Sequence, residues 1–275
     1  MSEHQQSGEN FSISSTPFSA FEEVSALYLI LCAGARDLRT RYQRYDAERD
    51  KYNGALPVPV WKIANFEGLK IRERNLSILD VTASSTSIGM LMGKLDYDLP
   101  DGPTIHLEEG ISSSRKNYVI AHELGHHWIK TTLKESLGPE HCSDTRLSVR
   151  YIEMLSDAFS AFLLLPIKAL FQEEKRYIDS HPQRPVNLEE MLASVAQTAD
   201  VPYYYVLTGY EYIKAVICCA RAVPKNQCFE AQLESYLDGP FQSLRDQVEQ
   251  IRKDIQGINP IFFAQVEDAT ETPER

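Results

Sequence analysis

The residues best able to do chemistry lie in one short segment, His122-Glu123-Leu124-Gly125-His126. Residues four apart in an α-helix lie on one face, so a helix here would point both imidazoles the same way. Glu123 would lie at the flank of that face. Two histidine nitrogens on a metal, with a carboxylate beside the water that the metal activates, form the arrangement that a zinc hydrolase needs. The segment therefore predicts His122 and His126 as zinc ligands and Glu123 beside the water.

The residues around this segment favour such a site over a surface helix with two incidental histidines. Ile120, Ala121, Leu124 and Trp128 would give the same helix an apolar back, which would pack against a core. Gly125 is unusual there, because glycine inside a helix costs about 1 kcal/mol relative to alanine. We expect a neighbouring element to approach the helix closely at this glycine.

A zinc hydrolase site uses three protein ligands and keeps a fourth position for water. The continuation HELGHHWIKTT has no glycine at position 129 and no histidine at position 132, so the chain is not a metzincin. The candidates downstream for the third ligand are His127, Glu135, Glu140, His141, Cys142, Asp144, Glu153 and Asp157. The adjacent pair His141-Cys142 is disfavoured, because neighbouring side chains rarely both turn to one ion.

Glu153 is the strongest of these candidates, because it begins a clearly amphipathic segment. The apolar stripe of that segment comprises Ile152, Leu155, Phe159, Phe162 and Leu163. Glu153 and Asp157 share another face of the predicted helix, one turn apart. Glu153 suits a metal ligand, and Asp157 suits an acceptor for the second ring nitrogen of a ligand histidine. A solvated acidic face stays open as the alternative.

The elements that must position these residues begin with a long helix. Residues 1–17 are rich in Ser, Gln and Glu and are predicted to be a disordered tail. The helix that follows should end near Asn53-Gly54, and its spacing favours packing on the protein's own core over a dimerising coiled coil. Its hydrophobic stripe comprises Phe21, Val24, Tyr28, Leu31, Ala35, Leu38, Tyr42 and Tyr45.

A small sheet and several helices complete the predicted fold. The runs 69–72, 78–81, 88–92 and 103–107 predict three or four strands. Ser112 to Ser114 offer N-caps for the HExxH helix, which should run to about Thr132. Residues 146–238 are predicted mostly helical, with breaks at prolines 166, 182–185, 202 and 224, and a last helix should stop at Gly257. The fold class is therefore α+β, mostly helical, with a small three- to four-stranded sheet before the HExxH helix.

Composition excludes several other classes of protein. The 275 residues carry 28 Lys+Arg against 39 Asp+Glu, a formal net charge of −11, which argues against a general nucleic-acid binder. The longest apolar run, 26–35, is far shorter than the roughly 20 residues of a membrane span. The N-terminal residues lack the basic region of a secretory signal. Five scattered cysteines without a CxxC pair indicate reduced thiols, so we expect a cytoplasmic protein with no membrane contact.

At this point the chain resembles the ImmA/IrrE family of metallopeptidases. The resemblance lies in RKNYVIAHELGH at 115–126 and in ExxSDxFSAFLLLP at 153–166, and it extends over roughly residues 55–215. Ser156 and Ser160 replace the usual alanines, and Leu165 replaces the usual methionine. The resemblance implies Zn²⁺ bound by His122, His126 and Glu153, with Glu123 as the catalytic base.

The same resemblance implies a substrate. Members of the family cleave a helix-turn-helix transcriptional repressor and so derepress stress-response or mobile-element genes. We expect the extended peptide to pair with an edge of the small sheet, with strand 103–107 as the candidate edge. An oxyanion-stabilising group is also required. The candidates for this group are His127, His141 and the tyrosines at 203–205, 210 and 212. For His106, contact with the substrate and no role in the site are equally open.

The predicted organisation is a metallopeptidase domain over residues 18–225, followed by a helix and acidic tail over 226–275. The main alternative function is a non-catalytic regulatory or antitoxin-like binding protein that keeps the fold. A deformylase-like hydrolase is disfavoured, because no upstream cysteine motif accompanies HExxH. A homodimer formed through the terminal helices is also among the expectations. Residues 186–214 have a helix–turn–helix rhythm but are acidic, so they are not predicted to read DNA.

Overall fold

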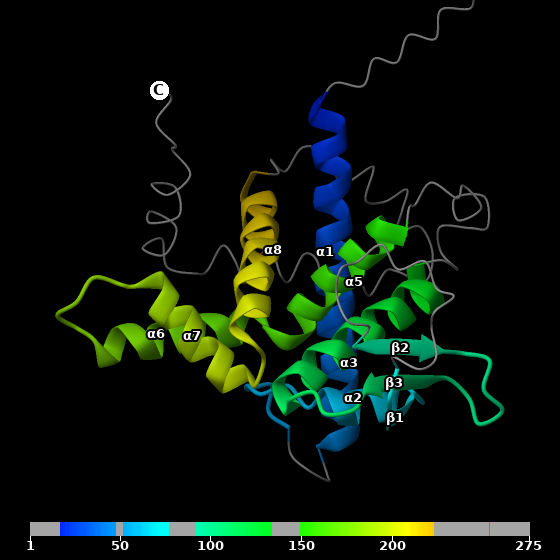
Figure 1. Ribbon diagram of the computed structural model, residues 1–275. Helices are drawn as coiled ribbons and strands as arrows, with labels where there is room; N and C mark the ends of the chain where they lie inside the picture. The colour runs from blue at the N-terminus through cyan, green and yellow to red at the C-terminus, as the bar shows by residue number, and fades with distance from the viewer. Residues whose placement is uncertain (1–16, 48–51, 77–91, 134–148, 223–252, 254–275) are drawn as a thin grey trace, which may run out of the picture.

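The computed structural model describes residues 17–47, 52–76, 92–133, 149–222 and 253. The predicted tail before Pro17, the loop of candidate ligands at 135–144, the strand at 78–81 and the C-terminal helix lie outside these residues. Within them the chain is mostly helical with one small sheet, so the predicted α+β class is confirmed (Figure 1). The elements are α1 (Pro17–Asp46), α2 (Val60–Phe66), β1 (Lys70–Arg74), β2 (Gly93–Asp96), β3 (Thr104–Glu108), α3 (Ser113–Trp128), η1 (Ile129–Leu133), α5 (Val149–Leu164), α6 (Ile167–Ser180), α7 (Leu188–Ala199) and α8 (Tyr203–Ala222).

The three described strands are ordered β1-β3-β2, with β1 parallel and β2 antiparallel to the central β3. The prediction that strand 103–107 forms a sheet edge is therefore wrong. Its successive residues Ile105, His106 and Leu107 are all buried, which is the pattern of a strand covered on both faces. Strand β2 lies just after the predicted run 88–92, of which only Met92 is described. Among the described strands, β1 and β2 are the outer ones.

Helix α1 packs against α5 and α8 and runs through the middle of the molecule (Figure 1). Leu31, Ala35, Leu38 and Tyr42 of its stripe are buried, as expected of a core-facing helix. The helix ends at Asp46, earlier than the predicted Asn53-Gly54. The buried Asp46 carboxylate accepts a hydrogen bond from the main-chain N–H of Tyr52.

The helix that carries HExxH begins as predicted, because the Ser112 side chain accepts a hydrogen bond from the main-chain N–H of Arg115. Helix α3 ends at Trp128, however, and the chain continues to Leu133 as a π-helix. Hydrophobic spacing does not distinguish one π turn from one α turn, so this change could not be predicted. Such single π turns are common at functional sites.

The remaining helices follow the predicted breaks. Breaks at Pro166, at 181–187 and at 200–202 separate α5, α6, α7 and α8. The α7–α8 turn is made by Asp200, whose φ of 51° is left-handed. The Asp200 carboxylate accepts hydrogen bonds from Ser113 and Asn117, which ties this turn to the start of α3. No single helix among the described residues is long and apolar enough to cross a membrane; the bent pair Ile152–Leu164 and Ile167–Ser180 reaches that length, with α5 packed in the core.

Candidate metal centre

Helices α3 and α5 meet at a glycine. A Cβ atom added to Gly125 would lie 2.9 Å from the main-chain oxygen of Ser156 and 3.0 Å from its Cα atom. No other residue would let the two helix backbones come this close, so the expected close approach at Gly125 is confirmed. The crossing places the face of α5 that bears Glu153 and Asp157 beside the histidines of α3.

The two histidines and Glu153 converge on one point. The Nε2 atoms of His122 and His126 are 3.0 Å apart. The Glu153 carboxylate oxygens lie 3.1 Å from the Nε2 atom of His122 and 3.4 Å from that of His126. These three side chains form a group able to hold a metal ion, with all three ligand atoms within 4.8 Å of one another.

Asp157 lies one turn further along α5 and fixes the orientation of His122. Its Oδ1 atom is 2.8 Å from the Nδ1 atom of His122 and also accepts a 2.5 Å hydrogen bond from the Tyr118 hydroxyl. Because a carboxylate only accepts, the Nδ1 atom of His122 carries the hydrogen and the neutral ring presents a lone pair at Nε2. The Nε2 lone pair then faces the Glu153 carboxylate.

Two lone pairs at 3.1 Å repel each other unless a cation lies between them. That cation is a proton or a metal ion. In the metal-free protein, burial lowers the pKa of His122, but the hydrogen bonds with Asp157 and Glu153 outweigh it and raise the pKa to about 10. Hydrogen bonds with the two histidines hold the pKa of Glu153 far below its ordinary value. The site is thus built to hold positive charge.

The donor set fits zinc. Ligand atoms at about 2.0–2.1 Å from a tetrahedral zinc ion are separated by about 3.3 Å from one another. The three separations between the ligand atoms, from 3.0 to 3.4 Å, lie close to that value. Two neutral imidazoles and one carboxylate, with a further position left for water, also match the ligands of catalytic zinc sites.

Glu123 lies on the other side of the histidines, between α3 and strand β2. Its side chain is only 6% exposed, and its carboxylate accepts a hydrogen bond from the main-chain N–H of Leu95. Burial raises the pKa of Glu123, although the neighbouring histidines lower it. Strand β2 comes close enough to do this because Gly93 has no side chain: a Cβ atom there would lie 2.2 Å from Val119.

Residues 76–199 match the peptidase M78 family, described as the IrrE N-terminal-like domain. They form an IrrE N-terminal-like domain. The resemblance to the ImmA/IrrE family is thereby confirmed, over a shorter range than the predicted 55–215. No curated protein matches the chain. The domain is metallopeptidase-like, and all three residues of the group able to hold a metal, with Glu123, lie within the matched range.

The IrrE N-terminal-like domain also has a tyrosine near Glu123, Tyr97, that no sequence pattern indicated. The hydroxyl of Tyr97, just after β2, is 3.1 Å from the Nδ1 atom of His127, and the two rings are stacked. The Lys130 ammonium lies 3.3 Å from the centre of the tyrosine ring. Burial and the charge of Glu123 raise the pKa of Tyr97 to about 12, so its hydroxyl remains a proton donor.

The other described candidates for substrate contact or oxyanion stabilisation are spread over the fold. His106 is buried within β3 and is not part of the group able to hold a metal. Tyr210 is buried, Tyr203 and Tyr204 are exposed, and Tyr205 is stacked on Tyr118 with ring centres 3.5 Å apart. Tyr118 was not among the predicted site residues, although its position four residues before His122, on the same helix face, indicates that it lies near the site. Tyr97 had no such signal, because nothing in the strand pattern indicates its neighbours.

Proposed function

We propose that the protein is a zinc-dependent endopeptidase whose substrate is a DNA-binding repressor protein. The observation that carries the catalytic part is the convergence of His122, His126 and Glu153 beside the buried carboxylate of Glu123. The membership of residues 76–199 in a peptidase family supports it. The cytoplasm is the proposed location.

Zinc bound by His122, His126 and Glu153 would lower the pKa of water to about 7 and polarise the scissile carbonyl. Glu123 accepts the proton of the attacking water and passes it to the leaving amine. Its raised pKa suits a base better than that of an exposed glutamate, and the Leu95 N–H holds the carboxylate in place. Asp157 keeps the hydrogen of His122 on Nδ1, which leaves Nε2 free for the metal.

Strand β2 is the proposed place for the peptide backbone. The register pairs Gly93 with Leu107 and Leu95 with Ile105, and the carbonyl of Met92 accepts the N–H of Glu108. In an antiparallel pair, hydrogen-bonded residues alternate with residues whose main-chain groups point away. The main-chain groups of Gly93 and Leu95 therefore point outward from the sheet, toward Glu123. The Leu95 N–H bonds to the Glu123 carboxylate, which leaves the groups of Gly93 and the Leu95 carbonyl for an extended substrate.

The repressor part of the proposal rests on the family resemblance and on charge. A net charge of −11 is unfavourable for binding operator DNA and favourable for binding a basic, DNA-binding protein. The binding of such a partner should weaken as ionic strength rises.

Glu123→Gln tests the proposal, since it removes the base and keeps the shape of the side chain. The protein, loaded with zinc, is incubated with candidate helix-turn-helix repressors, and fragments are identified by mass spectrometry. Glu211→Gln, an exposed position on α8, is the matched control. We expect one cleavage in the wild type and the control, and a loss of at least about 100-fold in Glu123→Gln with zinc content unchanged. Stable binding of a repressor without cleavage by the wild type would favour the non-catalytic alternative.

A further inference from the structure

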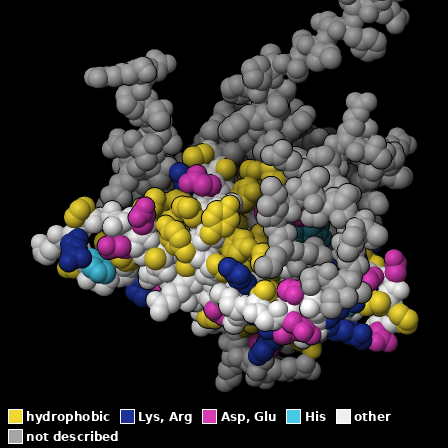
Figure 2. Space-filling model, in the orientation of Figure 1, with side chains coloured by type: hydrophobic (Ala, Val, Ile, Leu, Met, Phe, Trp, Pro, Cys, Tyr) yellow, Lys and Arg dark blue, Asp and Glu magenta, His cyan; other side chains and the backbone are white. Residues whose placement is uncertain are grey.

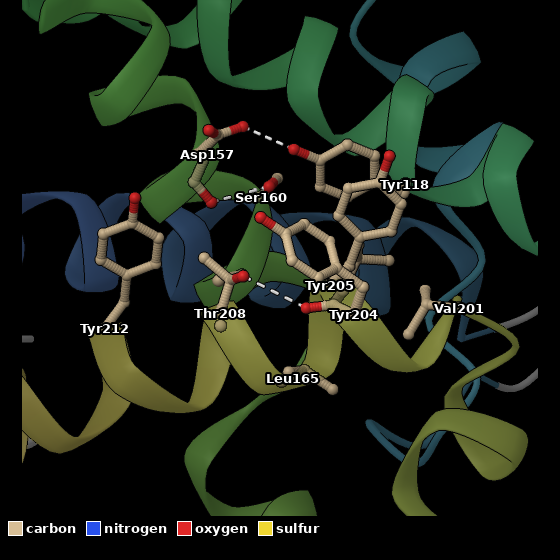
Figure 3. A pocket seen from close by; sticks show the side chains of 12 residues that line it. Tyr118, Asp157, Ser160, Leu165, Val201, Tyr204, Tyr205, Thr208 and Tyr212 are labelled. Atoms are coloured by element: carbon tan, nitrogen blue, oxygen red, sulfur yellow. Dashed lines mark hydrogen bonds between the residues drawn. The ribbon is translucent and has the colours of Figure 1, made fainter. Parts of the chain in front are cut away.

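A pocket that is open to solvent lies between α3, α5 and α8 (Figure 3). Its lining includes Tyr118 of α3, Asp157 of α5, and Tyr204, Tyr205 and Tyr212 of α8. Tyr118 and Asp157 each lie four residues, one helical turn of about 5.4 Å, from the ligands His122 and Glu153. The pocket is therefore the neighbour of the metal centre, on the side away from Tyr97.

The pocket and the metal centre share a carboxylate. The Oδ1 atom of Asp157 contacts the Nδ1 atom of His122 at 2.8 Å, and the same atom accepts the hydroxyl of Tyr118. A peptide held on β2 with its scissile bond at the metal would run along α3. One of its side chains next to the scissile bond would then lie over the pocket.

The chemistry of the walls favours an apolar occupant, because most of the lining is aromatic or aliphatic and three of its polar side chains are bonded within the walls. The Tyr118 hydroxyl donates to Asp157, the Ser160 hydroxyl donates to the main-chain oxygen of Asp157 at 2.7 Å, and the Thr208 hydroxyl donates to that of Tyr204 at 3.1 Å. The floor and the remaining walls are aliphatic or aromatic. They include Ala161, Leu164, Leu165 and Val201.

Two further features specify a large, flat side chain. Tyr118 and Tyr205 are stacked on each other with ring centres 3.5 Å apart, and the stacked pair is part of the pocket lining. At the mouth of the pocket, Tyr204 is 68% exposed, an unusual state for a large aromatic residue. Hydrophobic side chains gather on this face of the molecule around α8 (Figure 2), where Tyr203 and Leu207 are also exposed.

We propose that this pocket is a specificity subsite of the endopeptidase and accepts a large apolar side chain, preferably an aromatic one, next to the scissile bond of the substrate. The inference rests on the proposed function, whose substrate class it makes more specific. A cationic side chain is the less favoured occupant, since the Asp157 charge is already shared between His122 and Tyr118.

Binding tests the pocket independently of catalysis. The amides of N-acetylated phenylalanine, lysine and glycine are titrated into the full-length protein, and binding is followed by NMR of the tyrosine rings. We expect the phenylalanine derivative to bind at least about tenfold more tightly than the other two. Thr208→Trp, which fills the pocket, should abolish that preference. Leu207→Trp is the matched control, because Leu207 is adjacent, exposed and not part of the pocket wall.

Cleavage of a mixed peptide library by the zinc-loaded protein, read by mass spectrometry, tests the role of the pocket in the reaction. We expect Phe, Tyr or Leu at one position beside the cleaved bond, and a shift to small residues in Thr208→Trp but not in Leu207→Trp. Equal binding of all three amides, or a preference for lysine, would overturn the assignment of the pocket even if peptides are cleaved. Selective binding of phenylalanine without any cleavage of peptides or repressors would instead overturn the endopeptidase function, and with it the subsite role.

Discussion

The contact between Asp157 and His122 gives the sharpest prediction about the metal centre. Asp157→Asn keeps the size of the side chain and an oxygen acceptor but removes the negative charge. The hydrogen bond to Nδ1 changes from a charge-assisted bond, worth about 1.5–3 kcal/mol, to a neutral one of about 0.5–1.5 kcal/mol. The amide group of asparagine could also face the ring, which would favour the tautomer with its hydrogen on Nε2 and block the ligand atom.

The loss of about 1–2 kcal/mol corresponds to a zinc affinity roughly 5- to 30-fold weaker, which overlaps the lower part of the 10- to 100-fold range typical of such partners of metal-ligating histidines. Zinc affinity is measured by competition with a chromophoric chelator at pH 7.5. Circular dichroism of the metal-free protein checks that the helices are retained, since Asp157 is partly exposed and its loss should not unfold α5.

Tyr118→Phe is the matched control. It removes the second hydrogen bond to the same carboxylate oxygen and leaves the charged acceptor of His122 in place. We expect it to weaken zinc binding less than about threefold. Unchanged zinc affinity in Asp157→Asn, or an equal loss in Tyr118→Phe, would show that the carboxylate charge does not position His122.

Three further predictions concern the helix crossing, a buried acid and the oxyanion. Gly125→Ala should lower the melting temperature, because overpacking against the backbone of Ser156 costs about 1–3 kcal/mol and outweighs a gain of about 1 kcal/mol in helix propensity; an unchanged value would mean that the helices can separate. Burial raises the pKa of Glu174 from 4.5 to about 7, so this group lowers stability as pH rises from about 4.5 to about 7. Glu174→Gln should therefore stabilise the protein by about 1–2 kcal/mol at pH 8, after allowance for its partial contact with solvent, and hardly at pH 4.5, as measured by urea unfolding; equal effects at both pH values would contradict this. Tyr97→Phe should lower kcat at least about tenfold with KM and zinc content unchanged, if its hydroxyl stabilises the oxyanion, and an unchanged kcat would shift that role to His127.

Local patterns predicted most of the helices and the residues that the site brings together. The spacing of His122 and His126, and of Glu153 and Asp157, is a property of one helix at a time and can be read from the chain. The same holds for the apolar stripe of α1 and for the breaks at prolines 166 and 202, because proline acts on its own turn. Helix α1 ends earlier than its spacing predicts, and the contact of its last residue, Asp46, with the main chain of Tyr52 is not visible in that spacing.

The arrangement of the strands was not predictable in the same way. The order β1-β3-β2 puts strand 104–108 at the centre, although the sequence suggested it as an edge. A run of apolar residues shows that a strand is buried, but not which strands cover its two sides. The partner of Glu123, the main-chain N–H of Leu95, belongs to a strand whose position depends on that order.

The sequence by itself determined which side chains share a helix face and therefore which groups could act together: two histidines, a flanking glutamate, and a pair of carboxylates one turn apart. Only the tertiary structure decided how those faces meet. The backbone contact at Gly125 sets which carboxylate approaches Nε2 of His122 and which approaches Nδ1. The packing of α8 on α5 likewise forms the tyrosine-lined pocket beside the metal centre. Helical periodicity is a local property fixed by the backbone, whereas a helix crossing depends on contacts between residues far apart in the chain.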